Sequence, residues 1–211
     1  MPRIIKIFDH PLIQHKMAIL RDKNTTTQIF RSLISEITEL MFYEATKKLK
    51  TVPVDIETPL ATAHCQKLDG KTITVVPILR AGLAMMPAIQ SILPTTKIGM
   101  LGIYRDEQTH EPVEYFCKLP NDLELRDLFV VDPMLATGGS AVDAIKQIKK
   151  HNPRSITFVC ILAAPEGLNL LKNAFPDVDI FCGALDEKLT TDAYIFPGLG
   201  DAGDRIFGTV K

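Results

Sequence analysis

Short apolar runs alternate with helical patterns along most of the chain. The runs show no alternation with polar residues, which is typical of parallel strands buried on both faces of a sheet. They cover Thr72–Leu79, Leu128–Val131, Ser155–Ala163 and Val178–Ala184. Four strand–helix alternations with short links predict an α/β protein with a mostly parallel, doubly wound sheet flanked by helices. In such a sheet ligands bind at the carboxyl ends of the strands.

Apolar residues that recur every three or four positions predict the helices. The longest helix is expected to begin at a capping box formed by Thr25 and Gln28 and to run to about Leu49. Its apolar stripe consists of Ile29, Leu33, Ile37, Leu40 and Met41. Shorter helical patterns cover Leu12–Leu20, Leu83–Ile92, 141–148 and 168–175. The opening stretch, Arg3–Phe8, predicts an edge strand or an arm.

Two polar stretches separate predicted strands. Asp69-Gly70 is a strong turn signal between the candidate strand Ala61–Lys67 and the apolar strand that follows it. Further along, the strand Lys97–Tyr104 is followed by a polar stretch and then by the strand-like Val113–Leu119. The second pattern predicts an exposed hairpin whose tip has no apolar anchor.

Composition and charge exclude several classes of protein. The 211 residues suffice for one domain with a sizeable core, and no apolar run approaches the length of a membrane span. The net charge of −1 gives no attraction to nucleic acid or to an anionic membrane. With no C-x-x-C pair and no secretory signal, we expect reduced, buried thiols in a cytoplasmic protein. The cysteines are Cys65, Cys117, Cys160 and Cys182.

The strand Leu128–Val131 leads into a stretch suited to binding phosphate. Asp132 stands at the expected strand end, Pro133 stops further pairing, and small residues with hydroxyls and free amides follow from Ala136 to Ser140. The helix that comes next offers unpaired N–H groups and a partial positive charge to an anion. A Walker A loop is excluded because Gly139 stands where its Lys should be, and the turn lacks G-x-G-x-x-G. The remaining interpretation is a carboxylate for a pair of sugar hydroxyls beside a phosphate-binding turn.

Two further glycine turns follow strands. Arg80-Ala81-Gly82 ends an apolar strand and precedes a helix, which indicates a second anion-binding turn. Gly198–Gly203 matches G-x-G-x-x-G literally, but the eight residues after it leave no room for a crossover helix or a ribose-binding acid. We therefore exclude a dinucleotide site. After the strand Tyr194–Pro197, such a turn can instead press main-chain groups against a flat base.

Four motifs, in order and spacing, resemble the uracil phosphoribosyltransferases, a family of the type I phosphoribosyltransferase superfamily. They are PILRAGL, YRDEQTHEPVEYFCKLP, DPMLATGGS and AYIFPGLGDAGDR. The resemblance implies one domain, residues 1–211, with a β-hairpin lid at about 104–119 and a small base-binding hood, the tail at about 193–208. It implies a pentosyltransferase that transfers 5-phosphoribosyl from 5-phosphoribosyl diphosphate (PRPP) to uracil, giving UMP and diphosphate in pyrimidine salvage.

The resemblance also implies roles for individual residues. Catalytic roles fall to Arg80, Arg105, Asp132 and Asp201. PRPP ligands are Arg80, Arg105, Asp132, Pro133, Met134, Leu135, Ala136, Thr137, Gly138, Gly139, Ser140 and Asp201. Uracil ligands are Ile195, Gly200, Asp201 and Ala202. Most of the superfamily has two adjacent acids where this chain has Asp132-Pro133, as the uracil enzymes do, so we expect Mg²⁺ to arrive with PRPP rather than to be held mainly by protein side chains.

The expected partners follow from the same resemblance. They are PRPP, uracil or UMP, diphosphate and further copies of the chain in a homodimer or homotetramer, with a GTP effector left open and no nucleic acid or membrane. An alternative from another class is an RNA-binding regulator that shares the PRPP loop, but no basic cluster supports it. The same fold acting on another base is a third alternative. No residue stands out as a general base for the uracil proton.

Overall fold

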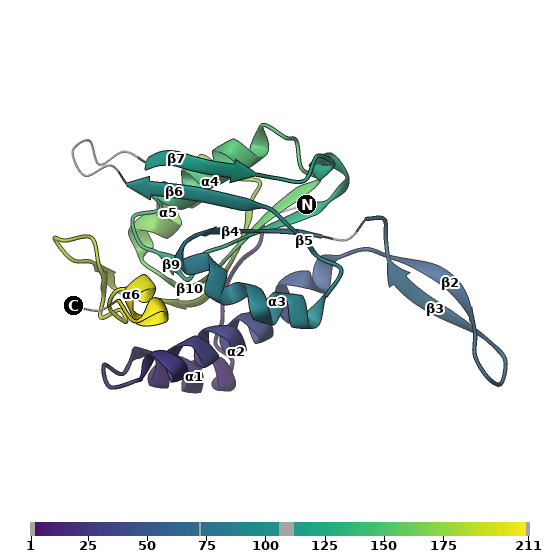
Figure 1. Cartoon of the computed structure of the whole chain (residues 1–211), viewed down its shortest axis with the longest axis horizontal. Helices are drawn as coiled ribbons and strands as arrows, with labels where there is room; N and C mark the ends of the chain where they lie inside the picture. The colour runs from purple at the N-terminus through teal and green to yellow at the C-terminus, as the bar shows by residue number, and fades with distance from the viewer. Residues whose placement is uncertain (1–2, 72, 106–111, 210–211) are drawn as a thin grey trace.

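A computed structural model describes residues 3–71, 73–105 and 112–209 (Figure 1). The strands of the central sheet are β1 Ile5–Ile7, β4 Thr74–Leu79, β5 Lys97–Ile98, β6 Met100–Arg105, β7 Pro112–Lys118, β8 Asp127–Val131, β9 Met134–Leu135, β10 Ser155–Ala163 and β11 Asp179–Leu185. Their order is β1-β11-β10-β8-β4-β6-β7, with β5 beside β4 and β9 beside β10. Described neighbours are parallel except for β6 and β7. The predicted mostly parallel sheet is confirmed.

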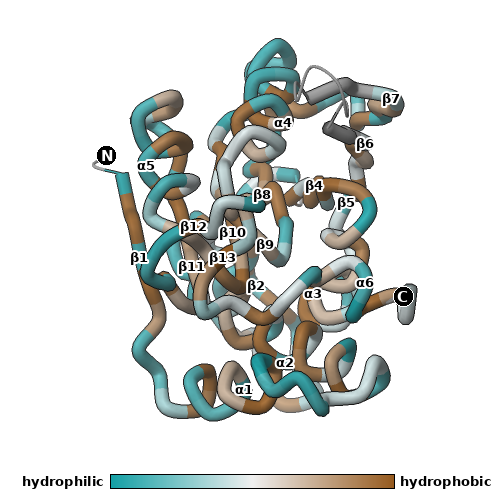
Figure 2. The backbone as a smooth tube through the Cα atoms, turned by 90° about the vertical axis from the view of Figure 1, so that its left-hand side faces the viewer, coloured by the Kyte–Doolittle hydropathy of each residue, from teal (hydrophilic) through white to brown (hydrophobic). Residues whose placement is uncertain are grey.

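Helices cover both faces of this sheet. They are α1 Pro11–Arg21, α2 Thr27–Ala45, α3 Met86–Ile92, α4 Gly139–Lys149, α5 Pro165–Ala174 and α6 Ala202–Phe207. Helices α1, α2, α3 and α6 lie on one side and α4 and α5 on the other (Figure 1). The central strands between these layers are hydrophobic along most of their length (Figure 2). The fold is thus a three-layer α/β arrangement with apolar packing on both faces of the sheet.

Strand β8 shows why the apolar runs lack alternation. Phe129 and Val131 pack in the cluster around α2, whereas Leu128 and Val130 pack in the cluster around α4. On the α2 side the rings of Phe42 and Phe129 meet edge to face, with centroids 5.1 Å apart. Because both faces of the strand are buried from Leu128 to Val131, each of these four positions is apolar.

The chain leaves β4 and β8 in opposite directions along the sheet. From β4 it passes through α3 to β5 and β6, and from β8 it passes through α4 to β10. The two strands are direct neighbours, with Thr74 opposite Leu128 and Pro77 opposite Val131. The loops at their carboxyl ends therefore diverge, and this topological switch point is where open α/β sheets bind ligands.

Two short antiparallel pairs lie outside the central sheet. β2 Thr51–Glu57 and β3 Thr62–Leu68 form an arm that projects from the body (Figure 1). β12 Lys188–Leu189 pairs with β13 Ile195–Phe196, which lies at the start of the tail. Described 3₁₀ helices cover Thr46–Lys48, Ala81–Met85 and Leu123–Leu125.

The two predicted strands on either side of Asp69-Gly70 do not pair with each other. Strand β3 pairs with β2 across the turn that begins at Thr58, where the Thr58 N–H donates to the Ala61 carbonyl oxygen at 3.1 Å. Strand β4 already has β8 on one edge and β5 and β6 on the other, so no edge is left for β3. Residues 51–57, where the sequence pattern predicts no helix or strand, form the strand β2 that pairs with β3.

The long helix begins and ends one turn or less from its predicted limits. Its N-cap is Thr26 rather than Thr25, because the Thr26 hydroxyl accepts the Ile29 N–H at 3.4 Å. The Thr25 hydroxyl instead donates to the Ile19 carbonyl oxygen at 2.5 Å. At the other end α2 stops at Ala45 and tightens into a 3₁₀ turn.

Only two of the four thiols are buried as expected. Cys160 and Cys182 lie opposite each other on β10 and β11 inside the α4 cluster, and burial raises the pKa of the Cys160 thiol. Cys65 on the arm and Cys117 on β7 are exposed, contrary to the expectation of buried thiols. Among the described helices, none combines the length and apolar character needed to cross a membrane.

Candidate active site

Two loops leave the sheet at the switch point and touch each other. Arg80 follows β4 directly, and the 3₁₀ helix Ala81–Met85 begins after it. A Cβ atom added to Gly82 would lie 2.6 Å from the carbonyl oxygen of Val131, the last residue of β8. Only glycine permits this approach of two backbones, and it places the Arg80 turn beside Asp132.

Asp132 is partly buried at the carboxyl end of β8. Its Oδ1 accepts the Met134 N–H at 3.3 Å, and its own N–H donates to the Val159 carbonyl oxygen at 3.2 Å. Burial raises the pKa of the Asp132 carboxyl to about 7, and the hydrogen bond from Met134 offsets this only in part. The group therefore titrates near neutral pH, and its ionised form can accept hydrogen bonds from two hydroxyls.

The small-residue turn after Asp132 is fixed by backbone contact with α5. Gly138 caps α4 in the left-handed region, with φ +88°. A Cβ atom on Gly138 would lie 2.9 Å from the Gly167 carbonyl oxygen, and one on Gly167 would lie 2.4 Å from the Ala136 carbonyl oxygen. Two glycines, one in the turn and one in α5, thus allow the backbone of the turn to pack directly against α5 at the N-terminus of α4. The helix dipole favours an anion there.

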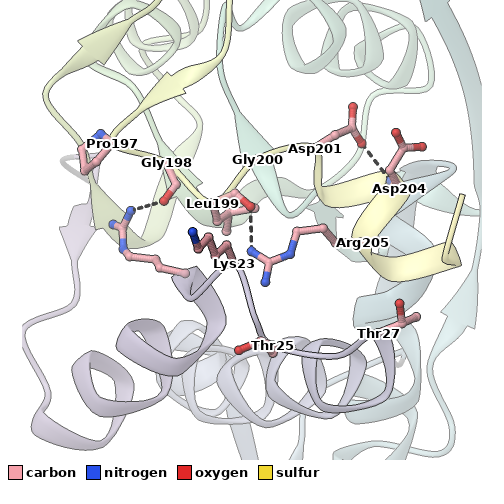
Figure 3. Close-up of a pocket in the computed structure, with 11 residues that line it drawn as sticks. Lys23, Thr25, Thr27, Pro197, Gly198, Leu199, Gly200, Asp201, Asp204 and Arg205 are labelled. Atoms are coloured by element: carbon pink, nitrogen blue, oxygen red, sulfur yellow. Dashed lines mark hydrogen bonds between the residues drawn. The ribbon is translucent and has the colours of Figure 1, made fainter. Parts of the chain in front are cut away.

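The C-terminal tail reaches the Arg80 side of the site. The Arg80 guanidinium lies 5.8 Å from the centroid of the Phe207 ring in α6. Asp201 caps this helix, because its Oδ1 accepts the Asp204 N–H at 2.8 Å (Figure 3). Gly200 precedes the cap with φ +82°. The stretch Gly200–Ala202, expected to contact a base, therefore begins at a glycine in the left-handed region.

Two uracil ligands implied by the resemblance have buried side chains. Ile195 is 5% exposed and Ala202 is 4% exposed, and both pack in the α2 cluster. A base could reach these residues only through their main-chain groups.

Arg105 is the last residue of β6. The pairing of Leu79 with Gly102 aligns β6 with β4, so the end of β6 lies at the same edge of the sheet as Arg80. Strands β6 and β7 form an antiparallel pair, as expected for a hairpin. The side chain of Arg105 and the tip of the predicted lid, residues 106–111, lie outside the described residues.

A cavity of about 440 Å³ opens between the tail and the corner that joins α1 to α2 (Figure 3). Its lining residues are Arg21, Lys23, Thr25, Thr27, Pro197, Gly198, Leu199, Gly200, Asp201, Asp204 and Arg205. The cavity shares Gly200 and Asp201 with the expected base site but does not include Arg80, Asp132 or the turn that follows Asp132. Apart from Asp201, which is also an expected PRPP ligand, the residues of the expected PRPP site therefore lie outside this cavity.

Three charged residues form hydrogen bonds to the backbone of the tail. The sequence pattern predicted no role for them. They are Arg21 at the end of α1, Asp186 after β11 and Arg205 in α6. Arg21 and Asp186 are 165 positions apart, so no local pattern connects them. Only Arg205 carried a signal, because it belongs to the motif AYIFPGLGDAGDR.

The donor set at this edge suits a metal ion carried by a substrate. Within the described residues, no group of three or more His, Cys, Asp or Glu side chains could hold a metal ion. The two carboxylates among the predicted PRPP ligands, Asp132 and Asp201, each accept a backbone N–H. Mg²⁺ commonly keeps several waters and binds through one or two carboxylates plus substrate phosphates, which fits these residues.

Comparison with known proteins gives a consistent result over nearly the whole chain. The family model for uracil phosphoribosyltransferase matches residues 7–209. The uracil phosphoribosyltransferase of Geobacillus sp. (strain WCH70) is 55% identical over 205 residues, which cover 97% of this chain and 98% of the relative. That of Ligilactobacillus salivarius (strain UCC118) is 53% identical over 204 residues, covering 97% and 98%.

Solved structures agree with the fold. The AQ2163 protein from Aquifex aeolicus has a TM-score of 0.92 and 38% identity, and the alignment covers 97% of this chain and 98% of that one. The adenine phosphoribosyl transferase of Trypanosoma brucei, solved with AMP, pyrophosphate and ribose-5-phosphate, has a TM-score of 0.60 at 10% identity, covering 93% and 88%. At that identity the likeness concerns the fold alone.

Proposed function

The chain belongs to the uracil phosphoribosyltransferase family, pentosyltransferases that convert uracil and PRPP to UMP and diphosphate, and we propose that the residues gathered at the β4–β8 switch point carry out this transfer. The observation that supports the proposal is the contact between Gly82 and Val131, which brings Arg80 and Asp132 to one edge of the sheet. An anion-binding turn and a sugar-binding carboxylate then lie side by side.

The ribose 5-phosphate half of PRPP fits the β8 side of the site. Asp132 accepts hydrogen bonds from the ribose hydroxyls, and the turn Thr137–Ser140 donates backbone N–H groups to the 5-phosphate. The α4 dipole adds to the attraction for that phosphate. These groups hold the anomeric carbon in place, so much of the rate enhancement comes from orientation.

The diphosphate half fits the β4 side. Arg80, with Arg105 from the end of β6, neutralises the negative charge that develops on diphosphate as it leaves an oxocarbenium-like ribose. Mg²⁺ bound with PRPP would supply further neutralisation of that charge. No described side chain is assigned as the base that removes the uracil proton.

The tail recognises uracil mainly through its backbone. Gly198–Gly203 contains three glycines, and the side chains of Ile195 and Ala202 are buried in the core. Uracil presents two carbonyl acceptors on either side of its N3–H donor, so a complementary main-chain row would be donor, acceptor, donor. Cytosine has an amine in place of one carbonyl and no hydrogen on N3, so two buried contacts would be mismatched.

Diphosphate release from PRPP and Mg²⁺ with each nucleobase in turn tests this proposal. We expect turnover with uracil and with 5-fluorouracil, because position 5 takes no part in the hydrogen-bonding row. Sites that hydrogen-bond a substrate commonly reject mismatched analogues by about 10⁴-fold, so cytosine should be turned over at about that disadvantage in kcat/KM. Cytosine used within about tenfold of uracil would exclude backbone recognition on this scale. The same assay with and without GTP tests whether GTP is an effector.

We further propose that the arm formed by β2 and β3 joins copies of the chain into the expected homo-oligomer. Opposite residues of the two strands share a face, and Val52, Val54 and Ile56 lie opposite Lys67, Cys65 and Ala63. One face of the arm is therefore largely apolar, yet Val52 and Ile56 are 40% and 45% exposed. An isolated two-stranded hairpin is marginally stable in water, so a second copy packed on this face would stabilise it.

A further inference from the structure

Both backbone polar groups of Gly198 are held by one ion pair. Arg21 Nη2 lies 2.6 Å from Asp186 Oδ1, and Arg21 Nη1 lies 2.8 Å from Asp186 Oδ2, so the pair is bidentate. Arg21 Nη1 also donates to the Gly198 carbonyl oxygen at 2.8 Å, and Asp186 Oδ2 accepts the Gly198 N–H at 2.8 Å. The side chains of Arg21 and Asp186 are 25% and 6% exposed. The ion pair is thus largely withdrawn from water, where loss of one partner is costly.

A second arginine fixes the next residue. Arg205 Nη1 donates to the Leu199 carbonyl oxygen at 2.7 Å (Figure 3). Arg205 Nη2 donates to the Asp22 carbonyl oxygen at 2.6 Å. Its guanidinium lies 4.3 Å from the centroid of the Phe30 ring in α2. The corner after α1 therefore meets the tail twice in succession, through the Arg21 side chain and through the Asp22 backbone.

These contacts end where the proposed uracil contacts begin. Gly198 and Leu199 immediately precede Gly200, the first residue of the proposed base-contacting stretch in the tail. Gly198 has φ +66°, and a Cβ atom there would lie 2.0 Å from the Ile195 carbonyl oxygen, so the turn allows only glycine. A row of backbone donors and acceptors recognises a base only if it is held within about 0.5 Å of its productive position.

We propose that Arg21 is a positioning residue for base recognition and that Asp186 is its partner. Through Gly198 the pair sets the position of the main-chain groups that contact uracil, although neither side chain is part of the proposed base contacts. The inference rests on the proposed recognition of uracil by the tail. It assigns to the end of α1 a part in base specificity.

The test compares three variants with a matched control. Arg21→Met keeps the length of the side chain without its donors, Arg21→Lys keeps the charge without the bidentate geometry, and Asp186→Asn keeps an acceptor for Gly198. The control is Arg154→Met, which breaks another bidentate pair, with Asp127 at the start of β8. That pair lies at the amino edge of the sheet, away from the tail.

Arg21→Met should lower kcat/KM for uracil by about tenfold or more, since charge-assisted hydrogen bonds to the tail are lost. The KM for PRPP should change by less than about threefold, because the ribose and phosphate contacts remain. The ratio of kcat/KM for uracil over cytosine should also fall, which a purely structural role would not produce. For Arg21→Lys, kcat/KM for uracil should fall between the values of wild type and Arg21→Met. Asp186→Asn should also lower both kcat/KM for uracil and the ratio of kcat/KM for uracil over cytosine.

Arg154→Met should lower the Tm without changing kcat/KM for uracil or the ratio of kcat/KM for uracil over cytosine. If Arg21→Met does not fold, Arg21→Lys and Asp186→Asn test the positioning role through kcat/KM for uracil and its ratio over the value for cytosine. Unchanged selectivity in folded variants, or KM values for uracil and PRPP that rise in parallel, would overturn the inference. Wild-type protein that fails to turn over uracil would instead refute the proposed function.

Discussion

At the scale of single residues, Asp132 combines two requirements that oppose each other. Its position at the end of a buried strand withdraws the carboxyl from water, which raises its pKa to about 7. Its proposed part in binding the ribose hydroxyls requires the ionised form. Ionisation is thus easiest to achieve at neutral pH and above, and a donor such as a sugar hydroxyl compensates for the lost water.

The Asp132→Asn variant should separate these effects in the kinetics. An amide cannot accept two hydroxyl hydrogen bonds with a full negative charge, so kcat/KM for PRPP should fall by about ten- to a hundredfold. In the wild type this parameter should also fall as the pH drops below about 7, because the carboxyl becomes protonated. Steady-state rates across the pH range check both points. Wild-type values in the folded variant would exclude the proposed role.

Stability should respond to the same group with a defined sign. Between the ordinary pKa of 3.8 and the folded value of about 7, the native state binds more protons than the unfolded state. The contribution of Asp132 to the free energy of unfolding therefore falls as the pH rises through this window. Asp132→Asn lacks that dependence, so its stability relative to wild type should increase from about pH 4 to about pH 7 and then level off. Urea denaturation at several pH values measures the difference, and a difference independent of pH would contradict the assignment.

At the scale of elements, the contact between α5 and the turn after Asp132 explains why the first turn of α5 contains a glycine, Gly167. Glycine costs about 1 kcal/mol relative to alanine inside a helix. At Gly167 a side chain would meet the Ala136 carbonyl oxygen at 2.4 Å and the Leu135 carbonyl oxygen at 2.8 Å. Both are backbone atoms that cannot rotate away. The turn after Asp132 can therefore pack against α5 only because Gly167 has no side chain.

Gly167→Ala should therefore lower stability although alanine is the better helix former. Overpacking typically costs about 1–3 kcal/mol, and for a chain of this size each kcal/mol corresponds to about 2–4 °C in Tm. The KM for PRPP should rise because the 5-phosphate turn is displaced. Thermal melts and PRPP titrations check the two effects, with Asn169→Ala on the exposed face of α5 as the control. A Tm at or above that of wild type would show that the backbone contact is not tight.

At the scale of the whole molecule, the arm formed by β2 and β3 has an apolar face that does not pack against the rest of the chain. Its apolar face is exposed, and Leu60 at its tip is 97% exposed. The opposite face carries Asp55 and His64, which contact each other at 2.6 Å between Oδ1 and Nδ1. An amphipathic hairpin with a polar outer face has the pattern of an element that packs on another surface.

Ile56→Asp should weaken the proposed association of copies. A charge in the centre of the apolar face has to be desolvated when a second copy packs on it, which is unfavourable without a partner. Light scattering during size-exclusion chromatography should then show a mass closer to the 23.4 kDa of one chain than wild type does. Gln66→Asp, which adds the same charge to the polar face, is the control. Equal masses for Ile56→Asp and wild type would argue against the arm as the contact.

The sequence alone determined the features that depend on local pattern. Unbroken apolar runs such as Leu128–Val131 predicted strands buried on both faces, since a strand between two helix layers has no side open to water. Asp132 and Arg80 could be placed at strand ends for the same reason, and parallel strands bring their carboxyl ends to one edge. The tail could be separated from a dinucleotide site because the motif lacked its strand–turn–helix context.

The tertiary structure alone decided what depends on distant partners. β3 pairs with β2 because both edges of β4 are occupied, and no spacing within residues 61–79 carries that information. The bond from Arg21 to Gly198 joins residues 177 positions apart, and the approach of Gly82 to Val131 depends on how two loops diverge from the sheet. Such contacts arise from the packing of complete layers, whereas residue spacing specifies only the elements that pack.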